Sequence, residues 1–260
     1  MTERPPAKKQ STVALFVTCL VDLMRPSVGF AALRLLERAG AQVVVPEKQT
    51  CCGQPAYNSG DNADARAIAQ QVISVFEQFD TVVIPSGSCG GMIKEHYPKL
   101  FADDEVWRNR AENLAARTQE LTQFLAANLD LNEVSAVVKG SVTYHDSCAG
   151  LRELGIKEQP RKLLATVDGL ELKEMDDTES CCGFGGLFSI KYPDVSGAIV
   201  DKKVDNIEAQ ETDMISGGDL GCLMNVAGKL KRRGSKVRVY HIAEILAGMT
   251  DAPGMGDGEP

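Results

Sequence analysis

Residues 51–53 read Cys-Cys-Gly, and residues 181–183 read Cys-Cys-Gly again. One further cysteine precedes each triplet and one follows it: Cys19, Cys89, Cys148 and Cys222. The interval before the cysteine pair is 32 positions in the first half and 33 in the second, and the interval after the pair is 37 and then 40. This spacing predicts two copies of one domain, because solenoid repeats have shorter periods of about 20 to 50 residues.

Size and charge exclude several classes of protein. The chain has 260 residues, of which 43% are hydrophobic and 25% charged, as in ordinary globular proteins. Its net charge is -8 and no basic run is denser than residues 229–233, so we expect no nucleic-acid partner. The sequence has neither a signal peptide nor the roughly 18 consecutive apolar residues of a membrane span. We therefore expect a cytoplasmic protein without a transmembrane segment.

Short β-rich runs alternate with helical patterns in both halves, which is typical of parallel sheets with crossover helices. The predicted fold class is α/β, with two duplicated lobes that each hold a small parallel sheet and are related by a pseudo-twofold axis. The predicted domains are a flexible N-terminus (1–11), a first lobe (12–130), a second lobe (131–250) and a flexible tail (251–260). Strands are predicted over residues 12–18, 42–46, 81–85, 142–145, 170–174, 212–216 and 237–240.

Two helical patterns stand out between these strands. Asp61 is predicted to cap a helix in which Ile68, Val72 and Phe76 recur on one face. A longer pattern over residues 104–129 predicts one helix that joins the lobes.

Each cysteine lies just after a predicted strand or in the loop that leaves it. The carboxyl ends of parallel strands meet at one edge of a sheet, so these cysteines should converge there. Crowded thiolates repel one another unless a cation neutralises them. We therefore predict two metal or cofactor sites, one in each lobe, with the ligands Cys19, Cys51, Cys52 and Cys89, and Cys148, Cys181, Cys182 and Cys222.

Iron-sulfur clusters are bound chiefly by cysteine thiolates, whereas all-cysteine zinc sites usually draw on Cys-x-x-Cys pairs. The sequence therefore favours iron and sulfide and predicts an electron-transfer subunit. Two alternatives stay open: a structural zinc or scaffold module, and a thiol-disulfide redox protein that uses the adjacent cysteine pairs.

No catalytic residue is identified from the sequence, and His145 is the one candidate. It stands three residues before Cys148, where it could ligate iron, donate a hydrogen bond to a cluster sulfur or couple a proton to electron transfer. A structural role at the end of a strand is equally compatible with its position. His96 and His241 have no constellation of cysteines or carboxylates nearby in the sequence and are interpreted as structural.

The motifs resemble those of the CCG-type cysteine-rich domain family and, within it, the lactate-utilisation protein A group. Beyond the early cysteine Cys19, the resemblance is carried by residues 51–55 (CCGQP), 86–92 (SGSCGGM), 144–148 (YHDSC), 181–186 (CCGFGG) and 221–225 (GCLMN). It implies an oxidoreductase subunit, inactive alone, that works with other iron-sulfur subunits to oxidise L-lactate or a similar 2-hydroxy acid to pyruvate.

The resemblance also bears on the type of cluster. Related subunits in heterodisulfide reductase hold noncubane clusters on motifs that end in Cys-x-x-Cys. Met92 and Asn225 stand at the matching final positions here, so each half lacks a fifth thiolate. The simpler expectation is one 4Fe-4S cluster per lobe.

Overall fold

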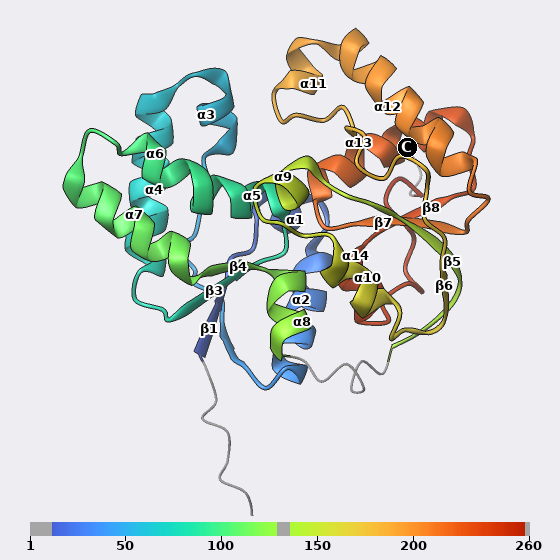
Figure 1. The fold of residues 1–260 in the computed structure, drawn as a ribbon, viewed down its shortest axis with the longest axis horizontal. Coiled ribbons are helices and arrows are strands. Elements are labelled where there is room, and N and C mark those ends of the chain that lie inside the picture. The colour runs from blue at the N-terminus through green and yellow to red at the C-terminus, as the bar shows by residue number, and fades with distance from the viewer. Residues whose placement is uncertain (1–11, 129–135, 258–260) are drawn as a thin grey trace, which may run out of the picture.

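The computed structural model describes residues 12–128 and 136–257 and shows two lobes side by side (Figure 1). Each lobe holds a parallel four-stranded sheet, in the order β2-β1-β3-β4 in the first lobe and β6-β5-β7-β8 in the second. The strands are β1 (Thr12–Leu15), β2 (Gln42–Val44), β3 (Thr81–Ile84), β4 (Thr118–Glu120), β5 (Val137–His145), β6 (Asp168–Leu172), β7 (Met214–Gly217) and β8 (Arg238–His241). The strand order is the same in both lobes, which confirms the predicted α/β duplication.

Helices connect the strands and cover both sheets. They are α1 (Cys19–Met24), α2 (Pro26–Arg38), α3 (Gln54–Ser59), α4 (Asn62–Phe76), α5 (Gly87–Gly91), the π-helix η1 (Met92–His96), α6 (Tyr97–Leu100), α7 (Glu105–Arg117), α8 (Leu121–Asn128), α9 (Cys148–Arg152), α10 (Glu158–Leu164), α11 (Phe188–Lys191), α12 (Pro193–Glu208), α13 (Leu220–Arg233) and α14 (Ile242–Leu246). None of the helices in the described ranges is long and apolar enough to cross a membrane.

The first sheet is buried on both faces, which explains the near-continuous apolar runs of its strands. Val13 and Leu15 of β1 point into a core that also contains residues of the second lobe. Ala14 and Phe16 point to the other side, into a core built from the first lobe alone. Between the lobes α2 packs against α14, α8 against α10 and α5 against α9 (Figure 1). The two lobes therefore share apolar core as well as surface contacts.

The predicted strands are all present, with ends that differ by up to five residues. The helix capped by Asp61 is also present: its carboxylate accepts a hydrogen bond from the Asp64 backbone N–H at 3.1 Å.

The single long helix predicted over residues 104–129 is wrong. The chain forms α7, then the strand β4, then α8. Thr118 has an extended backbone and pairs with Val82 of β3, and its hydroxyl donates to the Leu114 carbonyl at 2.8 Å. Three extended residues are too few to disturb the helical spacing on either side, so tertiary pairing overrode the pattern.

The flexible tail predicted over residues 251–260 is not what the structure shows for residues 251–257. The Met255 side chain is buried and its backbone N–H donates to the Val239 carbonyl at 2.8 Å. The Tyr240 hydroxyl donates to the Ala252 carbonyl at 2.7 Å, and Arg25 of the first lobe donates to the Pro253 carbonyl at 2.9 Å. The predicted N-terminus (1–11), much of the predicted lobe boundary and the last three residues lie outside the described ranges.

Candidate metal centres

Two cysteines of the first lobe lie in the first turns of helices. Cys19 is the first residue of α1, and the Thr18 hydroxyl caps that helix. Cys89 is the third residue of α5, where its backbone N–H donates to the Ser86 hydroxyl at 3.3 Å. The N-terminus of a helix carries a partial positive charge, and this charge favours the thiolate form of a cysteine.

The adjacent pair of the first lobe lies in a turn that glycine makes possible. Gly53 has a φ of 81°, in the left-handed region, and its N–H points to the Cys51 sulfur at 3.4 Å. The Tyr97 hydroxyl donates to the Cys52 carbonyl at 2.8 Å and fixes the turn. The Cys52 and Cys89 sulfur atoms lie 3.2 Å apart.

The second lobe repeats this arrangement. Cys148 is the first residue of α9, and Cys222 is the third residue of α13. Gly183 has a φ of 79° and its N–H points to the Cys181 sulfur at 3.3 Å. The Asn225 amide, rather than a tyrosine, donates to the carbonyl of the second paired cysteine at 2.8 Å.

Each quartet shares its protons so that one thiol becomes far more acidic than its neighbours. Hydrogen bonds from Cys19 and Cys52 lower the pKa of Cys51 to about 3. Its hydrogen bond to Cys51, and then burial, raise the pKa of Cys19 above its usual value. In the second lobe the neighbouring thiols lower the pKa of Cys181 to about 2 in the same way. The structure therefore brings the four predicted cysteines of each lobe together. All eight are free thiols, without the adjacent-pair disulfides.

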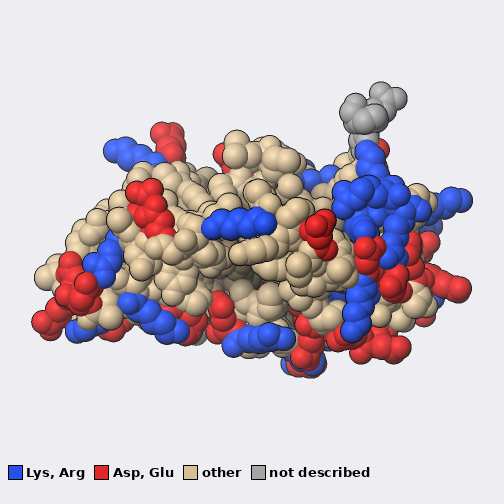
Figure 2. All heavy atoms as spheres, turned by 90° about the horizontal axis from the view of Figure 1, so that it is seen from above, with Lys and Arg blue, Asp and Glu red and all other residues tan. Residues whose placement is uncertain are grey.

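A cavity opens beside each quartet. The one that all four cysteines of the first lobe line has a volume of about 360 Å³, and the one that the second quartet lines has about 390 Å³. Both are lined by residues of both lobes and share Ser88, Phe184 and Asp219 as walls. Seen from above, the centre of the molecule carries few charged side chains and is hollowed (Figure 2). The two sites are therefore neighbours, and both lie where the lobes meet.

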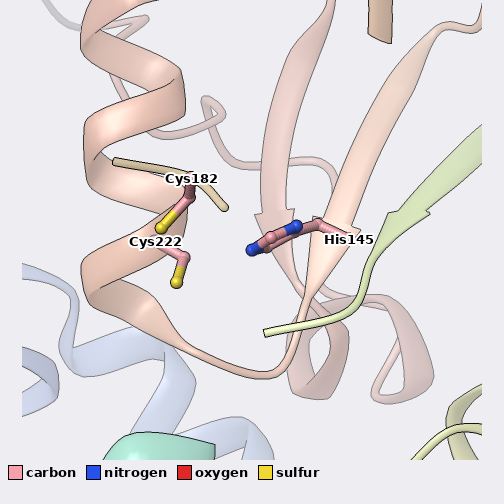
Figure 3. Close-up of side chains that lie close together, drawn as sticks. All are labelled: His145, Cys182 and Cys222. Atoms are coloured by element: carbon pink, nitrogen blue, oxygen red, sulfur yellow. The ribbon is translucent and has the colours of Figure 1, made fainter. Parts of the chain in front are cut away.

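His145 joins the second site and not the first. It is the last residue of β5, and one of its ring nitrogens, the Cys182 sulfur and the Cys222 sulfur all lie within 4.8 Å of one another. The ring points toward the two sulfur atoms (Figure 3). Burial, and then the charge of Lys203, lower its pKa to about 4, so the ring is neutral.

Asp219 links the two sites, a role that the sequence did not indicate. Asp219 precedes α13 in the second lobe, but its carboxylate accepts from the Ser86 hydroxyl at 3.0 Å and from the Ser88 N–H at 2.8 Å in the first. An aspartate before a helix normally signals a cap for its own helix, so no pattern in the sequence reveals this contact.

The glycines beside Cys89 pack helices rather than surround a cofactor. A Cβ at Gly87 would lie 2.9 Å from the Gly150 nitrogen of α9, and one at Gly91 would clash with the Glu153 carboxylate. They let α5 approach α9 of the other lobe closely.

Comparison with known proteins agrees with this arrangement. The model of the cysteine-rich domain family matches residues 13–94 and 142–227, one match per lobe. Lactate utilization protein A of Geobacillus sp. strain WCH70 is 49% identical over 234 residues, which are 90% of this chain and 98% of that protein. The protein of the same name from Exiguobacterium sp. is 51% identical over 236 residues, covering 90% of this chain and 96% of the relative.

Among solved structures, a hypothetical protein from Helicobacter pylori has the same fold, with a TM-score of 0.63 and 12% identity. The match covers 96% of this chain and 50% of that one. The doubled family match and the close, nearly full-length relatives lead to one conclusion. The chain belongs to the cysteine-rich domain family and, within it, to the lactate utilization protein A group.

Proposed function

We propose that this chain is an iron-sulfur electron-transfer subunit of a multi-subunit system that oxidises L-lactate, or a similar 2-hydroxy acid, to pyruvate. The convergence of each quartet on its own cavity carries the proposal. The ligands would be Cys19, Cys51, Cys52 and Cys89 in one centre and Cys148, Cys181, Cys182 and Cys222 in the other. We propose one 4Fe-4S cluster in each.

The residues around both quartets fit a cluster of iron and sulfide. Thiolates are the usual ligands of such clusters, and each quartet already contains one strongly acidic thiol. The N–H groups of Gly53 and Gly183 point at cysteine sulfur, where hydrogen bonds tune a reduction potential. A bound cluster supplies one-electron chemistry. The two cavities share walls at Ser88, Phe184 and Asp219, which supports the exchange of electrons between neighbouring centres.

The substrate class comes from the relatives, whose names specify lactate utilization. A two-electron oxidation of a hydroxy acid usually needs a flavin or a comparable electron acceptor, and the sequence contains no motif for one. We therefore propose that other iron-sulfur subunits complete the system, and that this chain alone does not oxidise lactate.

One observation favours a second candidate, a structural zinc module. Two sulfurs and one imidazole nitrogen within 4.8 Å are close enough to bind a single ion. Such a site would stabilise the second lobe without carrying electrons.

The experiment is anaerobic purification followed by counts of iron, acid-labile sulfide and zinc in the wild type, Cys52→Ser and Cys182→Ser. We expect iron and sulfide in the wild type, visible absorption that dithionite bleaches, and loss of about half of the iron in each variant. Glu179→Gln, an exposed change close to the second pair, serves as the control and should keep all its iron.

Other results would contradict the proposal. Colourless protein with zinc would favour the structural module, and metal-free cysteines that cycle with a dithiol would favour thiol-disulfide exchange. Lactate oxidation by the isolated chain would contradict the proposed division of labour among the subunits.

A further inference from the structure

His145 is the one residue of the described chain with two buried side-chain nitrogens that both lack a hydrogen-bond partner. Its side chain is almost wholly enclosed, with 1% of the residue exposed. Buried polar groups in native proteins nearly always have a partner, so a ring left without one indicates a ligand.

The surroundings of the ring show which ligand it would meet. His145 pairs with Gly217 of β7, so no side chain from the neighbouring strand fills the space beside it. The ring faces Cys182, from the Cys-Cys-Gly turn, and Cys222, from α13 (Figure 3). The ring has no hydrogen bond to either sulfur, although one of its nitrogens lies within 4.8 Å of both. The ring nitrogen and the two sulfur atoms thus lie close together without a hydrogen bond. A metal ion bound between these three atoms would account for that spacing.

The first lobe lacks this donor. Phe16 stands three residues before Cys19, as His145 stands three residues before Cys148. Phe16 is fully buried and packs against Phe76, with ring centroids 5.1 Å apart. An apolar ring therefore fills the position that an imidazole fills in the second lobe.

We propose, on the basis of the function above, that His145 is a fifth ligand of the metal centre in the second lobe. The two centres then differ: the first has four thiolates, and the second has four thiolates and one imidazole. A neutral nitrogen ligand adds a donor atom to one iron without adding negative charge. The ligands, net charge and hydrogen bonds of an iron-sulfur cluster set its reduction potential, so the two centres should differ in potential.

The test uses the full chain, purified anaerobically with 57Fe and 15N-labelled histidine. Pulsed electron paramagnetic resonance should detect a histidine nitrogen bound to iron in the wild type, and Mössbauer spectra should show one iron site unlike the rest. His145→Phe copies the buried ring of the first lobe, so it should fold and keep the iron held by its cysteines. It should lose the nitrogen coupling and the distinct iron site, and the potential of one centre should shift while that of the other stays unchanged.

A second buried histidine provides the control. His241 is fully buried and has one unpartnered nitrogen, but it caps α14. His241→Asn keeps a capping acceptor and should leave the nitrogen coupling intact. If iron is present in both lobes but the coupling is absent from the wild type or survives in His145→Phe, His145 is not a ligand. If the wild type holds no iron, the proposed function itself fails.

Discussion

The two lobes place their cysteines alike but support them with different residues. The carbonyl of Cys52 is held by the Tyr97 hydroxyl, and that of Cys182 by the Asn225 amide, both at 2.8 Å. Tyr97 lies eight positions after its α5 cysteine, whereas Asn225 lies three after its α13 cysteine. The duplication has kept the geometry of the thiols while the residues that fix it diverged.

The strand ends differ in a second way. The apolar Val17 stands two residues before Cys19 in the first lobe, whereas Asp146 stands two residues before Cys148 in the second. Arg161 binds both carboxylate oxygens of Asp146 at 2.9 Å, and the Asp146 side chain is only 1% exposed. The second lobe therefore holds a buried ion pair close to its cysteine quartet.

Breaking the ion pair between Asp146 and Arg161 should lower the stability of the protein more than any of the other changes below. Arg161→Met leaves the Asp146 carboxylate buried without a partner, which costs about 3 to 5 kcal/mol. We expect the melting temperature of the anaerobic protein to fall by roughly 10 °C. The control is Arg110→Met, which removes a half-exposed pair with Glu77 in the first lobe and should cost no more than about 1 kcal/mol. Equal losses would show that burial of the pair is unimportant.

The last strand of each sheet ends in a buried titratable residue. This residue is an acid in the first lobe and a base in the second. Glu120 ends β4, and its carboxylate accepts from the Thr122 N–H at 2.7 Å. His241 ends β8, and its ring accepts from the Ala243 N–H at 3.2 Å. Burial raises the pKa of Glu120 to about 7 and lowers the pKa of His241. Burial thus favours the neutral form of both residues.

These residues should give opposite responses to pH. An unfolded glutamate ionises near pH 4.5, but folded Glu120 keeps its proton until about pH 7, so stability falls as the pH rises between these values. The loss totals about 3 kcal/mol. Glu120→Gln should therefore be more stable than the wild type at pH 8 and little different at pH 5.

His241 makes the folded protein less stable as the pH falls. Its unfolded form takes up a proton as the pH falls through 6.5, which the folded form resists. His241→Asn should reduce the loss on the acid side and leave the alkaline side unchanged. Thermal melts from pH 5 to pH 8 check both variants, and parallel curves for wild type and variants would contradict the assignment.

The two turn glycines should differ in their tolerance of a methyl group. Alanine in the left-handed region costs about 1 kcal/mol at either position. At Gly183 the added Cβ would also lie 2.7 Å from the Ser196 backbone oxygen, whereas at Gly53 the nearest atom is a side-chain carbon of Ile68 at 3.3 Å. Gly183→Ala should therefore cost about 2 kcal/mol or more and release iron from the second lobe. Gly53→Ala should cost less, and the reverse order would contradict the clash.

The smallest loss of stability should come from removing the side chains that donate to the carbonyls of Cys52 and Cys182. Tyr97→Phe and Asn225→Ala each remove one buried hydrogen bond, worth about 1 kcal/mol. We expect each variant to release iron to a chelator faster from its own lobe only. Faster release from both lobes would show that the two turns are coupled.

The sequence by itself determined the duplication, the α/β class and the position of each cysteine after a strand. These features follow from local patterns, because apolar runs, glycine turns and cysteine spacing are read along the chain. The spacing also predicted that each quartet would converge, since parallel strands bring their carboxyl ends to one edge. The binding of iron by these cysteines stays a proposal.

Only the tertiary structure decided the contacts between lobes. Thr118 became part of a strand because β3 offered it a partner, and Asp219 became a partner of Ser86 because the residues before α13 reach the start of α5 across the interface. His145 gained its place beside Cys222 through the pairing of β5 with β7. Such contacts join residues more than 30 positions apart, and their energy depends on packing that no local pattern encodes.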